Sequence, residues 1–223
     1  MDDLENRVIS PILDFDKDRD VLAKMDFTDA NTELTNHIYS DTALFSKWVE
    51  DSLSKKNARY GIGGYGENRQ IYSRSTHFDS SVGEPRRLHL GTDIWAPALT
   101  TVYSPLPGIV HSFKFNGNFG DYGGTIILEH SFSEATFFTL YGHLSLQSLQ
   151  GLTKGHVFEQ GSVLANLGVA SENGNWPPHL HFQIILDLQG MEGDYPGVCR
   201  MSEREHYLKN CPDPAIILRH TFE

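Results

Sequence analysis

Between about Leu88 and Leu188 the sequence alternates short runs rich in β-branched and aromatic residues with clusters of Gly, Pro, Asn and Asp. Runs of this length, bounded by turn-forming residues, are typical of strands joined by tight connections. The expected strands are Thr101–Tyr103, Ile109–Phe115, Thr125–Glu129, Thr136–Tyr141, Ser162–Leu167 and His179–Leu186. Many short strands with few helices predict a mainly β protein, whose core is a small antiparallel β-sandwich or a partly closed barrel.

The segment before this β-rich stretch has a different pattern. Residues 1–56 favour helical or irregular structure, and Asp41 is a candidate N-cap for a helix from Thr42 to about Leu53. The apolar stripe expected on that helix consists of Leu44, Trp48, Val49 and Leu53. The three glycines between Tyr60 and Tyr65 are expected to end this region.

After Leu188 the sequence becomes rich in Gly and Pro, with one short strand expected at Ala215–Leu218. We therefore divide the chain into three parts. Residues 1–85 form an N-terminal helical or irregular region packed on the core, residues 86–189 form the β core, and residues 190–223 form a loop-rich C-terminal extension.

Two sequence patterns would place metal-binding side chains together. In His89-Leu-Gly-Thr-Asp93 the first and last residues are four apart, so on a strand they would lie on one face. In His179-Leu-His181 the two imidazoles are two apart and would also share a face, opposite an apolar layer. Each pattern alone is weak, because a surface strand often carries such residues. An imidazole and a carboxylate on one side are nevertheless a normal start to a zinc site.

A third pattern, Tyr141-Gly142-His143, ends one of the expected strands. Taken together, the three patterns offer more imidazoles than a single metal ion needs. A catalytic zinc uses three protein ligands and keeps one position open for water, whereas a structural zinc takes four protein ligands. The combination therefore favours a catalytic zinc with two further histidines available for proton transfer.

The ordered set of motifs resembles the lysostaphin-type zinc endopeptidases, which cleave peptide bonds in bacterial peptidoglycan. The similarity covers roughly residues 86–187. Its elements are His89-Leu-Gly-Thr-Asp93-Ile-Trp-Ala-Pro97, Gly108-Ile-Val110, Gly124–His130, Thr139-Leu-Tyr-Gly-His-Leu144, the glycines 161 and 168, and Pro178-His-Leu-His-Phe182.

The resemblance implies a role for each matching residue. His89, Asp93 and His181 would ligate one catalytic Zn2+, and His143 and His179 would be the catalytic histidines. Which of these two acts as the base stays open. The implied fold is a small antiparallel β-sandwich with a substrate groove over the metal, and residues 86–189 would be the catalytic domain. To this groove we assign three further residues, Tyr141, Trp176 and Asn118.

The implied reaction is hydrolysis of peptide bonds in Gly- or Ala-rich peptidoglycan cross-links. Two alternatives stay open: a hydrolase of the same fold acting on a cytosolic peptide or amide, and an inactive domain that binds peptidoglycan or regulates another protein. Gln183 departs from the family, which often has Glu there, and the segment Glu172–Trp176 replaces a common loop of small residues. Whether the N-terminal region blocks the groove is also open.

The formal net charge of −11 argues against a nucleic-acid partner, because phosphate contacts need clustered positive charge. No run approaches the roughly 20 apolar residues that span a bilayer. The acidic start of the sequence shows no secretory signal, which favours the cytoplasm, whereas the family role would place the protein in the cell envelope or outside the cell. Cys199 and Cys211 are either two reduced thiols or a single bridge. The oligomeric state is left open.

Overall fold

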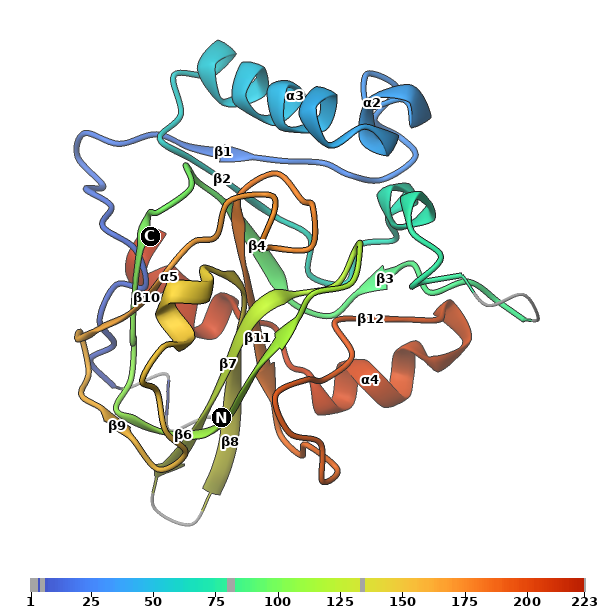
Figure 1. The fold of residues 1–223 in the computed structure, drawn as a ribbon. Helices are drawn as coiled ribbons and strands as arrows, with labels where there is room; N and C mark the ends of the chain where they lie inside the picture. Colours follow the sequence, from blue (N-terminus) through green and yellow to red (C-terminus); the bar gives the residue numbers. More distant parts are fainter. Residues whose placement is uncertain (1–3, 5–6, 80–82, 133–134, 223) are drawn as a thin grey trace.

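An eight-stranded mixed sheet runs through the centre of the structure, a computed structural model that describes residues 4, 7–79, 83–132 and 135–222 (Figure 1). The strand order is β1-β2-β4-β11-β8-β7-β6-β9, and only the β1–β2 pair is parallel. The strands are β1 (Leu22–Lys24), β2 (Tyr60–Gly63), β4 (Thr92–Trp95), β6 (Gly108–Asn116), β7 (Gly123–Phe132), β8 (Ala135–Leu144), β9 (Val157–Phe158) and β11 (His179–Ile185).

Two short ladders complete the β structure. Strand β5 (Thr101–Tyr103) pairs with β10 (Val163–Asn166), and β3 (Leu88–His89) pairs with β12 (Val198–Cys199). The main sheet keeps two edges, β1 and β9, so the described residues form no closed barrel. The prediction of a mainly β protein is confirmed, and each of the six expected strands overlaps an observed one.

The two faces of β11 have opposite characters. Leu180, Phe182 and Ile184 are fully buried in the largest apolar cluster, together with residues of β6, β7 and β8. His179 and His181 alternate with them and therefore project from the other face. Because β11 lies between β4 and β8, its histidines face side chains of both neighbouring strands.

The N-terminal region carries α2 (Asn36–Ser40) and α3 (Thr42–Lys55), which lie beside β1 and β2 (Figure 1). Asp41 caps α3 as predicted, since its carboxylate accepts hydrogen bonds from the backbone N–H groups of Ala43 and Leu44. The buried face of α3 is formed by Phe45 and Val49. The predicted stripe was wrong at Leu44, which is 39% exposed.

The helical part of this region ends at Lys55, and the glycine-rich stretch that follows forms β2, which pairs with β4 in the main sheet. One expectation about the C-terminal flank was wrong. The run beginning at Ala215 is the helix α5 (Ala215–Phe222), because Asp213 caps its first turn and an apolar run this short does not by itself distinguish a strand from a helix. The extension also contains α4 (Arg204–Asn210).

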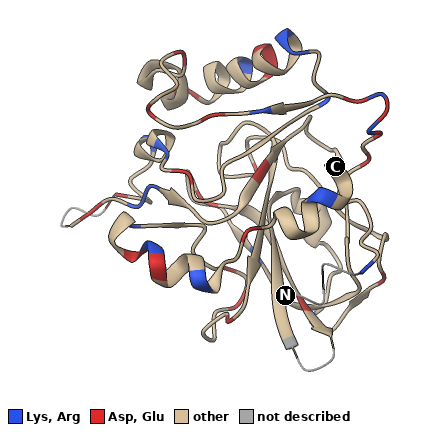
Figure 2. Cartoon of the chain, turned by 180° about the vertical axis from the view of Figure 1, so that it is seen from behind, with Lys and Arg blue, Asp and Glu red and all other residues tan. Residues whose placement is uncertain are grey.

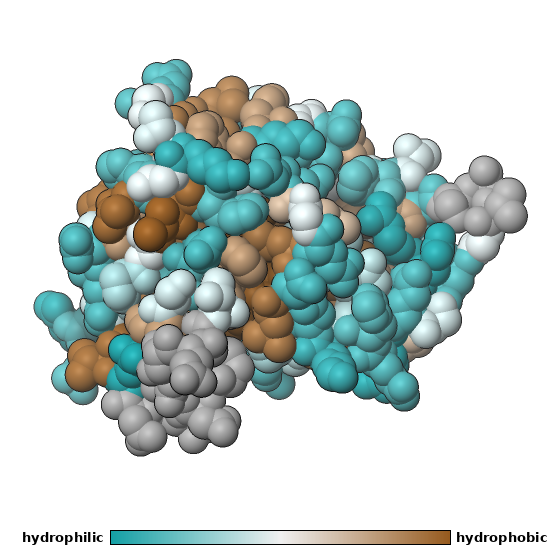
Figure 3. Space-filling model, turned by 90° about the horizontal axis from the view of Figure 1, so that it is seen from below, coloured by the Kyte–Doolittle hydropathy of each residue, from teal (hydrophilic) through white to brown (hydrophobic). Residues whose placement is uncertain are grey.

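The connections between these elements include three short 3-10 helices: η1 (Gln70–Arg74), η2 (Leu146–Leu149) and η3 (Met201–Glu203). Charged residues gather on the helices and outer loops and are sparse on the central strands (Figure 2). From below, apolar residues reach the surface as patches among hydrophilic ones (Figure 3). No helix in the described ranges combines the length and the apolar character that crossing a bilayer requires.

Candidate metal centre

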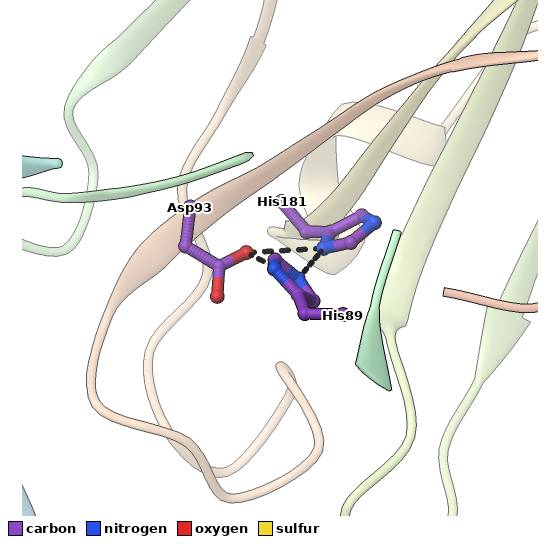
Figure 4. A group of neighbouring side chains, drawn as sticks. All are labelled: His89, Asp93 and His181. Atoms are coloured by element: carbon purple, nitrogen blue, oxygen red, sulfur yellow. Dashed lines mark hydrogen bonds and ion pairs between the residues drawn. The ribbon is translucent and has the colours of Figure 1, made fainter. Parts of the chain in front are cut away.

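His89, Asp93 and His181 converge on one point inside the molecule (Figure 4). Nε2 of His89 lies 2.9 Å from Nδ1 of His181, and Oδ1 of Asp93 lies 3.3 Å and 3.0 Å from these two nitrogens. All three side chains are buried, with residue exposures of 1%, 3% and 2%. Two imidazole nitrogens and one carboxylate oxygen thus meet in a small volume.

The strands that carry these residues differ from the sequence expectation. His89 ends β3, the backbone leaves the strand at Leu90 and Gly91, and Asp93 lies on β4. The prediction that His89 and Asp93 share one continuous strand was therefore wrong. They still meet, because β4 pairs with β11 in a register that sets Asp93 opposite His181.

Gly91 leaves the space that the His181 imidazole occupies. A Cβ atom at position 91 would lie 2.6 Å from Cε1 and 2.7 Å from Nε2 of His181, which is closer than real contacts of this kind. Any side chain at this position would have to displace the imidazole. The glycine between His89 and Asp93 is therefore part of the construction of the site.

Each of the three residues has its second polar atom engaged by a neighbour. Nδ1 of His89 donates to the carbonyl of Gly64 at 3.0 Å, and Nε2 of His181 donates to Oε1 of Gln183 at 2.9 Å. Oδ2 of Asp93 accepts from Nη1 of Arg69 at 2.5 Å. Such outer contacts fix the tautomer and orientation of a ligand, so the three inward-facing atoms carry free lone pairs.

Electrostatics keep His89 and Asp93 in metal-binding form. Burial lowers the pKa of His89 to about 3, so its imidazole is neutral at physiological pH. Burial opposes the charged form of Asp93, but the buried Arg69 guanidinium and the hydrogen bond with His181 outweigh it and hold the pKa of that carboxyl well below its usual value. Neutral imidazoles and an ionised carboxylate are the forms that bind a cation.

Two more imidazoles lie beside this group. The rings of His143 and His179 have their centroids 4.1 Å apart, and Nε2 of His179 lies 4.0 Å from Oδ2 of Asp93. Nδ1 of His143 donates to the carbonyl of Asn173 at 2.8 Å. Nδ1 of His179 donates likewise to the carbonyl of Pro177 at 2.7 Å, which leaves an acceptor nitrogen, Nε2, on both rings.

Burial lowers the pKa of both imidazoles, and for His143 the neighbouring His179 and His181 add to the effect. His143 also has a left-handed backbone with φ of 63°, at the end of β8 where the pairing with β7 shifts register. A bulge of this kind turns a side chain out of the regular alternation of a strand. The irregular backbone therefore aims His143 at His179.

All five residues line a cavity of about 410 Å3. Phe45, Tyr72 and Phe78 from the N-terminal region contribute aromatic side chains to its wall. Glu192, Asp194 and the segment Tyr195–Val198 close it from the C-terminal side. The walls are thus supplied by three parts of the chain that are distant in sequence.

The three predicted groove residues have different positions. Trp176 lines the cavity, and its ring centroid lies 6.5 Å from those of both His143 and His179. Tyr141 does not line it: its side chain is fully buried in the apolar core with Phe182, because the irregular backbone at His143 breaks the strand alternation that would otherwise put the two side chains on one face. Asn118 is exposed outside the cavity and reaches it only through Asp121, at 3.3 Å.

Sequence reasoning missed the contributions of Gly64 and Arg69. Both lie before the motif-bearing segment, and an isolated Arg or a backbone carbonyl carries no recognisable pattern. Gln183 was noted only as a departure from a familiar motif, yet it contacts His181 directly. Cys199 and Cys211 are both buried and unpaired in this structure.

Comparisons with known proteins agree with the motif analysis. Residues 87–192 match the sequence model of the family described as Peptidase family M23. The DD-carboxypeptidase/endopeptidase Mpg of Neisseria meningitidis serogroup B is 35% identical over 104 residues, which are 46% of this chain and 21% of that protein. The chain thus spans about a fifth of the length of the curated relatives it matches.

Solved structures give weaker matches. A zinc-containing peptidase from Vibrio cholerae is 29% identical, with a TM-score of 0.35 over 44% of this chain and 27% of that one. The catalytic domain of the antimicrobial peptidase lysostaphin from Staphylococcus simulans is 19% identical, with a TM-score of 0.45 over 78% of this chain and 97% of that one.

Proposed function

Residues 87–192 of this chain belong to peptidase family M23, and from this premise we propose that the protein is a zinc endopeptidase acting on peptidoglycan cross-links. Its substrates would be peptide bonds in Gly- or Ala-rich bridges. The observation that carries the proposal is the buried group His89, Asp93 and His181 beside two neutral imidazoles. The name of the Mpg relatives, a DD-carboxypeptidase/endopeptidase, supports the same substrate class.

The donor set fits one catalytic zinc ion. Two imidazole nitrogens and a carboxylate oxygen are among the ligands that catalytic zinc sites use, and the fourth position of such a site belongs to water or substrate. Gly91 leaves room for the His181 ring, and the outer atoms of all three residues are already engaged. His89, Asp93 and His181 would therefore hold the ion.

When bound there, zinc supplies Lewis acidity and lowers the pKa of a coordinated water toward neutrality. The protein's own contribution is proton transfer at Nε2 of His143 and His179, whose Nδ1 protons are held by the carbonyls of Asn173 and Pro177. One imidazole would accept a proton at Nε2 and, once protonated, return it to the leaving amine; the other could stabilise charge on the scissile carbonyl oxygen only with a proton on its own Nε2. Trp176 and the other aromatic side chains of the cavity exclude bulk water.

One observation favours a second candidate, hydrolysis of a short peptide or another small amide. The five polar residues are at most 5% exposed, and the cavity of about 410 Å3 has the size of a small-molecule site. A long, cross-linked polymer would enter such a site only through the free end of an extended peptide. The chemistry is the same in both candidates, and only the length of the accepted substrate differs.

A substrate series tests both candidates. The zinc-loaded chain would be incubated with intact sacculi, with purified cross-linked muropeptides and with free dipeptides to pentapeptides rich in Gly or Ala, and the products identified by mass spectrometry. We expect cleavage of a cross-link peptide bond that stops when the metal is chelated and resumes when zinc is restored. Turnover of short peptides with intact cross-links would instead support the second candidate.

A third outcome would remove both proposals. If the zinc-loaded protein binds muropeptides stoichiometrically and cleaves nothing in the series, the chain is a binding or regulatory domain. Locating the native protein gives an independent comparison, since peptidoglycan as substrate requires the cell envelope and a cytosolic peptide requires the cytoplasm.

A further inference from the structure

Arg69 contacts the metal centre from outside the segment that matches the family. Its side chain is fully buried. In the sequence Arg69 directly precedes η1, whereas the family match begins only at residue 87. Nη1 donates to Oδ2 of Asp93 at 2.5 Å, and Nε donates to Oε2 of Glu67 at 2.6 Å. The guanidinium thus bridges two carboxylates, one of which belongs to the candidate metal ligands.

The surroundings are built around this planar group. The guanidinium carbon lies 5.1 Å from the ring centroid of Phe27 and 5.5 Å from that of Trp95, and Nη2 donates to the carbonyl of Gly63 at 3.3 Å. At Gly64, whose φ is 106°, a Cβ atom would lie 1.7 Å from Nη2. A lysine has neither the fork of donors nor the flat shape that these contacts match.

The contact with Asp93 separates the functions of its two oxygens. Oδ2 is held by Arg69, whereas Oδ1 faces Nε2 of His89 at 3.3 Å and Nδ1 of His181 at 3.0 Å. A carboxylate fixed in this way offers a cation one oxygen. If both oxygens turned toward the ion, the carboxylate would occupy the position that a catalytic site keeps for water.

We propose that Arg69 is a positioning residue that holds Asp93 as a one-oxygen ligand and so keeps a coordination position open. This inference rests on the proposed function. The same short segment also supplies the Gly64 carbonyl that orients His89, so it aligns two of the three ligands. The N-terminal region then contributes contacts that position the metal ligands, and it does more than cover the site.

Two variants test the proposal without leaving the Glu67 carboxylate unpaired. Arg69→Lys keeps the charge but loses the fork, and the double variant Glu67→Gln with Arg69→Gln removes both charges together. We expect zinc affinity, measured by competition with a chelator, to fall about 10- to 100-fold in the double variant and less in Arg69→Lys. The cobalt-substituted double variant should show weaker visible absorption than the wild type, the signature of a higher coordination number.

Arg74→Gln is the matched control. Arg74 ends η1, is partly buried against the rings of Phe119 and Trp176, and donates to Thr42 Oγ1. Its variant should keep the zinc affinity and the cobalt spectrum of the wild type. Wild-type affinity and an unchanged spectrum in the folded Arg69 variants would overturn the proposal.

A crystal structure of the zinc-loaded wild type gives a test that does not depend on whether the variants fold. It should show Oδ1 of Asp93 alone on the ion and Oδ2 on Arg69, and an Asp93 bound through both oxygens would overturn the inference. A wild-type protein that binds no zinc would be a different failure, because it would refute the proposed function itself.

Discussion

Nε2 of His181 lies 2.9 Å from Oε1 of Gln183, two residues along the same face of β11. The amide is held from its other end, because its nitrogen donates at 3.2 Å to the carbonyl of Pro196 and at 3.2 Å to the sulfur of Cys211. The C-terminal part of the chain thereby fixes the amide that orients His181. Gln183 accepts the outer hydrogen bond of the His181 ring, as the Gly64 carbonyl does for the His89 ring.

Replacing Gln183 by Leu should lower zinc affinity about 10- to 100-fold, because the His181 ring loses the acceptor that fixes its tautomer. Gln183→Glu keeps an oxygen toward His181 and should bind zinc more tightly than the Leu variant. Chelator competition measures both, with Gln147→Leu, an exposed glutamine on η2, as the control. Equal affinities in all four proteins would show that Gln183 does not act on the site.

Gly91→Ala should abolish tight zinc binding, since the added methyl overlaps the His181 ring at 2.6 Å. The matched control is Gly108→Ala, where the new Cβ would meet Cε1 of a different imidazole, His130, at 2.7 Å. Both variants should lower the melting temperature through overpacking. Zinc titration then separates them: the Gly108 variant should bind like the wild type, and tight binding by the Gly91 variant would contradict the assigned geometry.

His143→Ala and His179→Ala should each retain bound zinc while kcat falls about 10²- to 10⁴-fold, the usual contribution of a positioned acid or base. Neither residue belongs to the group that would hold the ion. The measurements are zinc content and steady-state kinetics on the same samples. His156→Ala, an exposed histidine, should leave both unchanged. A wild-type kcat in either site variant would remove that histidine from the mechanism.

His130 should make stability depend on pH, at a distance from the candidate metal centre. Its Nδ1 lies 2.8 Å from the carbonyl of Pro107 and its Nε2 lies 2.7 Å from Oγ1 of Thr139. Burial lowers the pKa of His130 to about 4, and the hydrogen bond to Pro107 offsets this only in part. The folded protein therefore keeps this imidazole neutral, whereas the unfolded chain protonates it near pH 6.5.

The stability that His130 contributes is complete above about pH 6.5 and is lost as the pH falls toward 4. Between pH 7.5 and 4.5 the loss amounts to about 2 to 3 kcal/mol of unfolding free energy. Urea denaturation of the metal-free protein measures this loss. Over the same pH interval, the unfolding free energy of His130→Gln should fall by about 2 to 3 kcal/mol less than that of the wild type. An identical pH dependence in the two proteins would refute the assignment.

The sequence predicted the parts of the site that lie on regular strands. His179 and His181 share a face of β11, opposite Leu180 and Phe182, because alternation along a strand depends only on local geometry. The prediction that His89 and Asp93 lie close together assumed one continuous strand, but the strand breaks at Gly91. The backbone leaves β3 there, and the pairing of β4 with β11 brings the residues together.

The remaining contributions depend on contacts between distant segments. Arg69 reaches Asp93 over 24 positions, and the cavity wall includes Phe45 and Pro196 from opposite flanks of the core. Such contacts leave no periodicity in a single sequence. Tyr141 was misplaced for a related reason: it adjoins His143, but the backbone irregularity at His143 sends the two side chains to different faces.

Zinc content and peptide hydrolysis, measured together on the wild type and on His181→Ala, test the central claim most directly. The account predicts one zinc per wild-type chain with cleavage that depends on it, and a folded His181→Ala protein that has lost both. A zinc-free His181→Ala protein that hydrolyses the wild-type substrate at the wild-type rate would contradict it.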